Sequence, residues 1–243
     1  MRAPRQSESA GIHLRLLIAA ALAMLPLGCR TARVETEPGL SGPVGPGAGT
    51  IADIPEPVHV ARRLIREHRK GEALAVLEED RPLDAAEPER TWLLVAIWTE
   101  RHEGARARRA AATLPRTAFG AAVRSLAAET PLEAMAHVGP WLGGRHPWVH
   151  VAAGIIHGQE GDDEAMEAAT TRALDGAPPF VAFDAYFGRA RARMELGRLA
   201  EAEADARSAA AVNPRDARGP LMISELERRR GDLAGAVESL LEA

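Results

Sequence analysis

The sequence predicts an all-α protein built from about six helix–turn–helix pairs that follow one another along the chain. First, a motif returns at a fixed spacing, because the six residues that begin at Gly197 (GRLAEA) reappear at Gly231 (GDLAGA), 34 residues later. A period of this length is typical of stacked helical repeats. Second, apolar residues make up 46% of the chain but aromatic residues only 4%, which suits closely packed helices rich in Ala and Leu. Third, no segment alternates apolar and polar residues as a half-buried strand does.

Residues 1–28 are predicted to be an export signal. Three arginines precede an apolar run over residues 16–27, which is too short to span a bilayer and has the length of a signal-peptide core. The run ends in LPLGC, with Cys29 last, and this resembles the lipobox of bacterial lipoproteins. The resemblance implies that Cys29 becomes the lipidated first residue of the mature chain, although Pro26 stands where the family prefers Leu. The alternative is a plain secretory signal with a chance cysteine.

The anchored chain is expected at the cell envelope. In the lipoprotein family an Asp after the cysteine favours the inner membrane, so Arg30 favours the outer membrane, facing the periplasm. Residues 29–57 hold the lipidated cysteine and a stretch rich in Gly and Pro without apolar periodicity. Such a composition predicts a flexible tether, with a root-mean-square span of roughly 30 Å.

Residues 58–243 are predicted to form the helical pairs. Glycine can adopt a positive φ, so it suits the tight turn inside a pair. The glycines predicted for such turns are Gly71, Gly104, Gly161, Gly197 and Gly231. The predicted pairs are 58–69 with 72–79, 89–102 with 105–114, 117–129 with 132–138, 147–159 with 162–175, a pair over 183–214, and 218–230 with 232–241.

The segment from Phe183 resembles a tetratricopeptide repeat. Its signature places, counted from Phe183, hold Tyr186, Ala190, Gly197, Ala202, Ala209 and Pro214, and Gly231 and Ala236 continue the pattern. Small residues let two antiparallel helices pack closely, and proline cannot continue the helix before it. The resemblance is specific over 147–243, moderate over 58–114 and poor over 117–140, and it implies a right-handed α-solenoid. An ordinary Ala-rich bundle is the alternative, but it has no reason to repeat at a fixed offset.

The net charge and the cysteine content argue against several kinds of partner and site. The net charge of −4 argues against nucleic acid as the main partner. A single cysteine excludes an intrachain disulfide framework and a cysteine zinc site. The arginines at 62, 63, 66 and 69 form a basic helix edge, which we interpret as a solvated face.

No catalytic or cofactor site is predicted. The spacing of His146, His150 and His157 could place metal ligands on one helix face, but no nearby carboxylate completes the set, so we favour structural histidines and no metal. The sequence holds no phosphate-binding glycine loop, no G-x-S-x-G and no H-E-x-x-H. It therefore predicts neither an enzyme nor a bound cofactor.

The family resemblance implies a groove for a protein partner, lined by the first helix of each pair. The positions that face this groove in the family are occupied here by Trp148, Val151, Ile155, Phe187, Arg191, Arg218 and Leu221. They form an apolar strip with arginine at its rim, which suits an amphipathic helix or an extended apolar segment, with Trp148 and Phe187 as anchors. The alternative is that these side chains only pack against neighbouring pairs.

The function expected from the resemblance is a membrane-anchored scaffold that binds a protein partner during envelope assembly. Tetratricopeptide lipoproteins that act as pilotins for type IV pilus secretins have this layout, and others assist outer-membrane protein assembly or regulate cell-wall synthesis. A self-associating structural protein is the further alternative, because the last helix ends on Leu240 and Leu241 without a polar capping helix. The oligomeric state stays open, and light scattering would separate a self-associating chain from a monomer.

Overall fold

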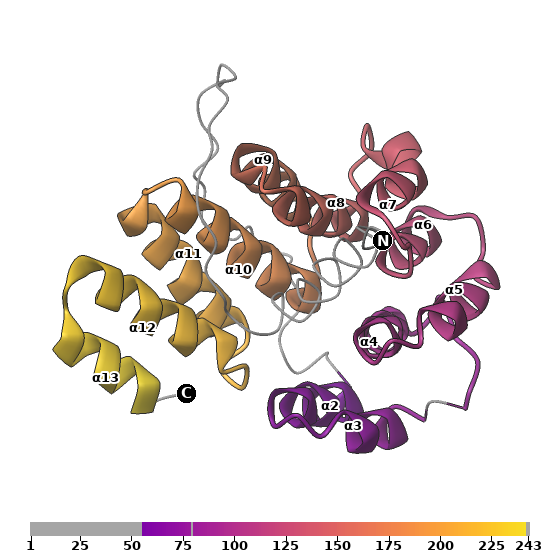
Figure 1. The fold of residues 1–243 in the computed structure, drawn as a ribbon, viewed down its shortest axis with the longest axis horizontal. Helices are drawn as coiled ribbons and strands as arrows, with labels where there is room; N and C mark the ends of the chain where they lie inside the picture. Colours follow the sequence, from indigo (N-terminus) through magenta and orange to yellow (C-terminus); the bar gives the residue numbers. More distant parts are fainter. Residues whose placement is uncertain (1–54, 79, 242–243) are drawn as a thin grey trace, which may run out of the picture.

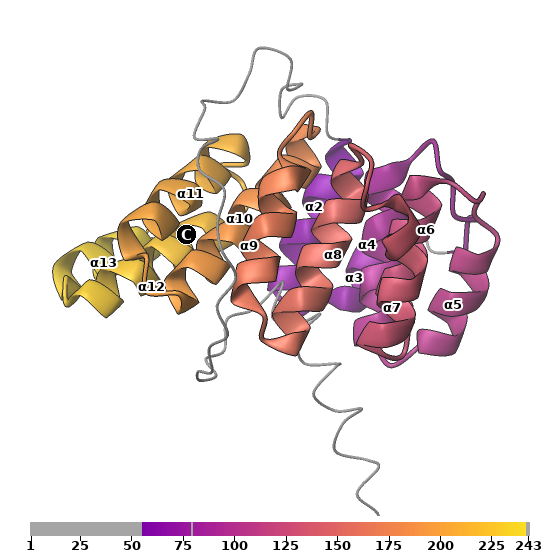
Figure 2. The same ribbon diagram turned by 90° about the horizontal axis from the view of Figure 1, so that it is seen from above.

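Antiparallel helix pairs make up the described part of the chain. The computed structural model describes residues 55–78 and 80–241, in which we find twelve α-helices and no β-strand. Successive pairs stack side by side (Figures 1 and 2), so the fold is the all-α solenoid that the sequence predicts. The pairs are α2 (Glu56–Arg66) with α3 (Lys70–Val76), α4 (Pro88–Glu100) with α5 (Gly104–Ala112), α6 (Ala118–Leu126) with α7 (Pro131–Val138), α8 (Pro147–Glu160) with α9 (Asp163–Ala173), α10 (Pro179–Glu195) with α11 (Leu199–Val212), and α12 (Arg218–Arg230) with α13 (Leu233–Leu241).

The first helix begins slightly earlier than predicted. α2 starts at Glu56, two residues before the predicted boundary, and Pro57 lies in its first turn. Proline is tolerated there because the first backbone N–H groups of a helix have no partner within the helix. The predicted export signal, the lipidation site at Cys29 and nearly all of the predicted tether lie outside the described residues.

Five of the six turns inside the described pairs contain a residue with positive φ, but glycine provides it in only three of them, and the turn between α6 and α7 has none. Gly161, Gly197 and Gly231 have φ values of 75°, 78° and 84°, as expected for their predicted role. In the first two pairs the prediction was wrong, because residues 71 and 104 belong to α3 and α5. The left-handed residues there are His68 (φ 59°) and His102 (φ 65°), which lie 34 residues apart. The 34-residue period therefore extends to the first two pairs. There the turn position is occupied by His68 and His102, and not by the glycines at 71 and 104.

The two kinds of glycine should respond oppositely to alanine. Gly197→Ala is expected to lower the free energy of unfolding by about 1–2 kcal/mol, because L-residues resist the left-handed conformation. A Cβ at this position meets no atom within 4 Å, so the cost comes from the backbone alone. Gly71→Ala is the matched control inside a helix and should raise the same free energy by up to about 1 kcal/mol. Urea denaturation measures both values, and a loss of stability at residue 71 would contradict the assignment of the turn.

Small side chains lie where neighbouring helices approach most closely. Ala190, Ala202 and Ala209 are fully buried, and Ala236 is nearly so. The phenol of Tyr186 is also buried. Gly154 faces α9 so closely that a Cβ would lie 2.8 Å from Thr170 Cγ2. These residues of the repeat pattern therefore act through packing.

Arg90 fixes the connection between the first and the second pair. Its guanidinium is buried and donates hydrogen bonds to the carbonyl oxygens of Leu77, Glu78, Arg81 and Pro82, at distances of 2.7 to 3.1 Å. Burial and the nearby positive charge of Arg81 lower the pKa of Arg90, while surrounding carboxylates oppose that shift. The loop between α3 and α4 is thus bound by one side chain of α4, which sets the position of the first pair.

The first pair also contacts the far end of the solenoid. Arg62 on α2 lies 3.3 Å from Asp184 on α10 and 3.5 Å from Asp216 in the loop before α12. In the same loop, Arg215 pairs with Glu56 at the start of α2 at 3.2 Å. Figure 1 accordingly shows α2 on the same side of the molecule as α12. In solenoids, repeats ordinarily contact only their neighbours, so the described helices here close into a ring.

The last helix leaves an apolar face uncovered in the described residues. Val237 and Leu240 on α13 are 58% and 51% exposed. The residues 34 positions earlier are Glu203, which pairs with Arg230 of α12, and Ala206, which is fully buried. The face of α13 therefore corresponds to the face of α11 against which the following pair packs.

Candidate binding groove

A groove runs along the inner side of the ring, between the first helices of the pairs. Its volume is about 900 Å³, counting the part that opens to solvent. The first helix of every described pair contributes to it, and α9 reaches it between α8 and α10. The lining residues are Arg62, Trp92, Leu93, Ala96, Leu126, Val151, Gly154, Ile155, Gly158, Gln159, Met166, Thr170, Asp184, Phe187, Gly188, Arg191 and Arg218.

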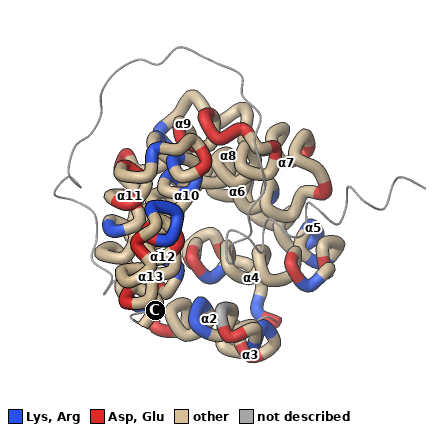
Figure 3. Tube along the Cα trace, turned by 60° about the vertical axis from the view of Figure 1, so that its left-hand side comes forward, with Lys and Arg blue, Asp and Glu red and all other residues tan. Residues whose placement is uncertain are grey.

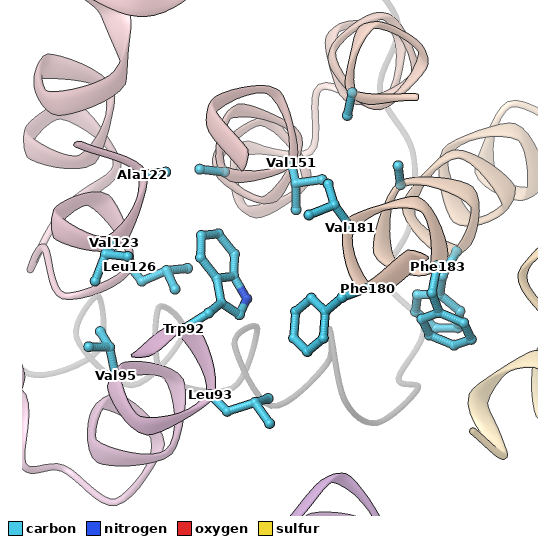
Figure 4. Packing of buried hydrophobic residues seen from close by; sticks show 14 of the residues in the cluster. Trp92, Leu93, Val95, Ala122, Val123, Leu126, Val151, Phe180, Val181 and Phe183 are labelled. Atoms are coloured by element: carbon cyan, nitrogen blue, oxygen red, sulfur yellow. The ribbon is translucent and has the colours of Figure 1, made fainter. Parts of the chain in front are cut away.

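Helical spacing explains why α8 and α10 supply most of the wall. Residues three, four and seven positions apart lie on one face of a helix. On α8 this face holds Val151, Ile155 and Gln159, and on α10 it holds Phe187 and Arg191. Figure 4 shows the apolar side chains of this region, among them Trp92 on α4, Val151 on α8 and Phe180 on α10. The wall is therefore mainly apolar, with polar groups towards its ends.

Glycines let α9 approach the groove from behind. A Cβ at Gly158 would lie 2.8 Å from the sulfur of Met166, and one at Gly188 would lie 3.0 Å from Thr170 Cγ2. The side chains of Met166 and Thr170 thus fill the space that glycine leaves on α8 and α10. The Thr170 hydroxyl donates to the carbonyl oxygen of residue 166 at 2.7 Å, so this part of the wall offers no free donor.

Four charged side chains close one end of the groove. Arg218 lies 3.0 Å from Asp184 and 3.0 Å from Asp216, and Arg62 contacts the same two carboxylates. We call these four residues the ion-pair cluster. Burial by itself would raise the pKa of Asp216, but Arg218 and Arg62 together outweigh it and hold this pKa well below its ordinary value. The cluster carries no net charge and is held within the protein.

Aromatic rings support both arginines of the ion-pair cluster. The guanidinium carbon of Arg62 lies 3.7 Å from the ring centre of Phe180, and that of Arg218 lies 4.5 Å from the ring centre of Phe183. Such cation–π contacts are strongest where the cation is shielded from water. Because Phe180 and Phe183 are completely buried, the rings fix the arginines in place as part of the core.

The polar groups at the other end of the groove have no such partners. Gln159 and Arg191 are half-buried and make no hydrogen bond or ion pair with a described residue. Gly158 and Gly188 both lie against Met166, and Gln159 and Arg191 line the groove from the two helices that carry these glycines. This end of the groove therefore presents an amide and a guanidinium.

The structure brings together five of the seven residues predicted for the partner groove. Val151, Ile155, Phe187, Arg191 and Arg218 all line it. However, Arg218 was expected at an open rim, and it is instead buried in the ion-pair cluster. The guanidinium of Arg218 forms ion pairs with Asp184 and Asp216. The repeat pattern could not indicate this pairing.

The other two residues predicted for the groove lie away from it. Trp148 is half-buried on α8 and packs against Trp92, Phe119 and Phe180, with ring centres 5.1, 5.2 and 5.5 Å apart. Trp92 itself lines the groove, so Trp148 supports the wall from outside. Leu221 on α12 is half-buried and does not border the groove.

Sequence reasoning also placed one arginine on the wrong face. Arg62 was interpreted as part of a solvated edge, but it is only 4% exposed and lines the groove. Arg63 and Arg69 are exposed, as that interpretation expects, and the side chain at 66 is outside the described ones. No local signal distinguishes Arg62 from its neighbours, because its partners lie 122 and more residues further along the chain. Trp92 and Leu93 were missed as well, although the apolar run WLLVAIW indicates a buried helix.

The histidines considered as metal ligands do not converge. His150 is buried, with Nε2 2.8 Å from the carbonyl oxygen of Gly144, and the ring of His146 lies edge-on to Trp141. Within residues 55–78 and 80–241, no three potential ligands form a group that could hold a metal ion. Across the same residues, no helix has both the length and the apolar character needed to cross a bilayer.

The charges of the described chain are spread over all helix pairs. Figure 3 shows basic and acidic residues interspersed along the solenoid, with no face in that view covered by one sign. Many of these residues pair across helices, as Arg189 does with Asp205 at 2.7 Å and Arg229 with Glu195 at 3.0 Å. The groove, rather than the outer surface, is therefore the distinctive feature of the fold.

Comparisons with known proteins find similar folds among solved structures. No protein-family model matches the sequence, and no curated protein matches it. The chain is similar to TTC0263, a thermophilic TPR protein of Thermus thermophilus, with 22% identity and a TM-score of 0.46 over 76% of this chain and 97% of that one. It is also similar to MamA of AMB-1, with 14% identity and a TM-score of 0.38 over 77% of this chain and 95% of that one. At this level of similarity, neither structure indicates a ligand or a partner for this chain.

Proposed function

We propose that this chain is a scaffold that binds an apolar segment of a partner protein in the groove. The observation that carries the proposal is the wall itself, on which Val151, Ile155 and Phe187 face a space that no described residue fills. A concave, mainly apolar surface with a few placed polar groups is the usual form of a binding site. The stretch from Val151 to Gln159 is about 12 Å long, which suits about two turns of a bound helix or about four residues of an extended segment.

The proposal extends to the cell envelope. The apolar run before Cys29 supports export and lipidation, and the Gly- and Pro-rich stretch after it supports a tether between the lipid and the solenoid. Such an anchor would hold the groove beside a membrane, where it could serve an assembly role such as that of a pilotin for a secretin. Two or more acyl chains are needed for stable attachment. Mass spectrometry of the mature protein tests the anchor, and an unlipidated chain that starts elsewhere than Cys29 would refute it.

A substitution that fills the groove tests the binding role. Random 12-residue peptides displayed on phage would be selected on the immobilised full chain. We expect apolar peptides whose affinity falls at least about tenfold for Ile155→Trp, because the indole occupies the space between α8 and α10. The matched control is Leu132→Trp, which adds the same ring at an exposed site on α7 outside the groove.

Two results would refute the binding role. One is a selection that yields no apolar peptide at all. The other is a set of peptides that bind both tryptophan variants and the unsubstituted chain equally well, since their site would then lie outside the groove. Circular dichroism would first establish that both variants keep the helical content of the parent chain.

A further inference from the structure

Arg191 is the one cation of α10 that does not serve the fold. Arg189 pairs with Asp205 at 2.7 Å, and Arg193 contacts Glu167 at 2.8 Å and Asp205 at 3.0 Å. These two arginines therefore connect α10 to α9 and α11. Because residue 191 lies between them in sequence, its side chain leaves the opposite face of the helix, towards the groove.

The charge of Arg191 is not neutralised by a contact within the described chain. No carboxylate of a described residue lies within ion-pair distance of its guanidinium. It acts only at longer range on Asp163, the first residue of α9. Burial, reinforced by the charge of Glu195, raises the pKa of Asp163, and Arg191 opposes that rise. The guanidinium nitrogens of Arg191 are not among the buried atoms that lack a partner, so solvent reaches them, and the carboxylate of a ligand can reach them as well.

We infer that the protein segment bound in the groove carries an acidic side chain that pairs with Arg191 and accepts a second hydrogen bond from the amide of Gln159. The inference rests on the proposed function and specifies its ligand. A guanidinium fork and an amide that line the same groove can donate to the two oxygens of one carboxylate. At the far end Asp184 is already paired with two arginines, so no free charge is offered there.

The positions of these groups set the spacing of the ligand. Arg191 follows Phe187 by one helical turn on α10, and Gln159 follows Ile155 by one turn on α8. A bound helix that places an apolar side chain between Ile155 and Phe187 would present its carboxylate three or four residues away. We therefore expect the bound segment to contain an apolar anchor residue and an Asp or Glu one helical turn away from it. Because, among the described residues, only one end of the groove offers an unpaired cation, the segment should bind in one orientation.

Parallel selections test this specificity. The same peptide library would be selected on the full chain and on the full chain with Arg191→Gln. Acidic residues should be enriched near the apolar anchor on the parent chain and not on the variant. A synthetic copy of a selected peptide should then lose about tenfold in affinity for the parent chain when its acid is changed to the amide, and should change little for Arg191→Gln.

Two further variants separate pairing from a general charge effect. Arg172→Gln removes the same charge from the exposed surface of α9 outside the groove, and it should leave the preference for the acidic peptide intact. Arg191→Lys should keep part of the preference. Because Arg191 has no hydrogen bond or ion pair with a described residue, Arg191→Gln should melt within a few degrees of the parent chain.

The outcomes distinguish this inference from the function on which it rests. Peptides that lose affinity for Ile155→Trp but show no preference for acidic residues would overturn the role of Arg191. The binding role of the groove would still be supported. The role of Arg191 would also be overturned if changing the peptide's acid to the amide lowered its affinity equally for the parent chain and for Arg191→Gln. Peptides that are indifferent to Ile155→Trp would overturn both.

Discussion

Arg218→Met is expected to lower the free energy of unfolding by about 3–5 kcal/mol, because it leaves a buried carboxylate with too little positive charge. Asp216 is only 2% exposed, and its contact with Arg62, at 3.5 Å, is longer than the 3.0 Å ion pair that it would lose. Urea denaturation measures the loss. The matched control is Arg215→Met, which breaks the exposed pair with Glu56 between the same two parts of the chain and should cost less than about 1 kcal/mol. Equal effects of the two variants would show that burial of the ion-pair cluster contributes little.

The same cluster predicts how stability depends on pH. Since the pKa of Asp216 is lower in the folded chain than in the unfolded one, its contribution is complete above the unfolded value of about 4 and is lost as the pH falls further. Between pH 5 and pH 2 the parent chain should therefore lose stability more steeply than Asp216→Asn. Parallel curves for the two chains would contradict the lowered pKa.

Trp148→Ala is expected to lower the free energy of unfolding by about 3 kcal/mol, near the lower end for a tryptophan because the ring is only half-buried. Its indole contacts three aromatic rings from α4, α6 and α10, so its loss would loosen three pairs together. Thermal and urea unfolding would report the effect, with Leu132→Ala at an 82% exposed position as a control that should change little. Peptides selected on the groove should still bind the variant well below its melting temperature, since Trp148 does not line the wall. If the Trp148→Ala variant is stable but no longer binds these peptides, Trp148 is a binding residue of the groove and its assignment as a supporting residue is wrong.

The sequence predicted the helices far better than the contacts between distant pairs. Helix pairs and their order follow from apolar periodicity and from the 34-residue repeat, which are local properties. The register of the first two turns was wrong because His68 and His102 adopt a conformation that glycine usually marks. Histidine is among the few residues enriched there, but nothing in composition singles out these two.

The candidate groove shows the same division between local and distant information. Val151, Ile155 and Phe187 could be placed on its wall because they occupy fixed positions in the repeat. The buried roles of Arg62 and Arg218 could not be predicted, since each depends on carboxylates supplied by other helix pairs. A pattern within one helix shows which face is polar, but it does not show whether that face meets water or another part of the chain.

Closure of the ring has a consequence for the order of folding during synthesis. Helices of a solenoid can ordinarily form and dock as soon as their neighbours exist. Here α2 leaves the ribosome among the first helices, whereas the carboxylates that neutralise its buried Arg62 belong to residues 184 and 216. Joining ends so far apart costs loop-closure entropy and slows folding compared with purely local contacts. The first helix pair is therefore made early but completes its packing only when the chain is nearly finished, and until then its buried surface is a site that a chaperone can bind.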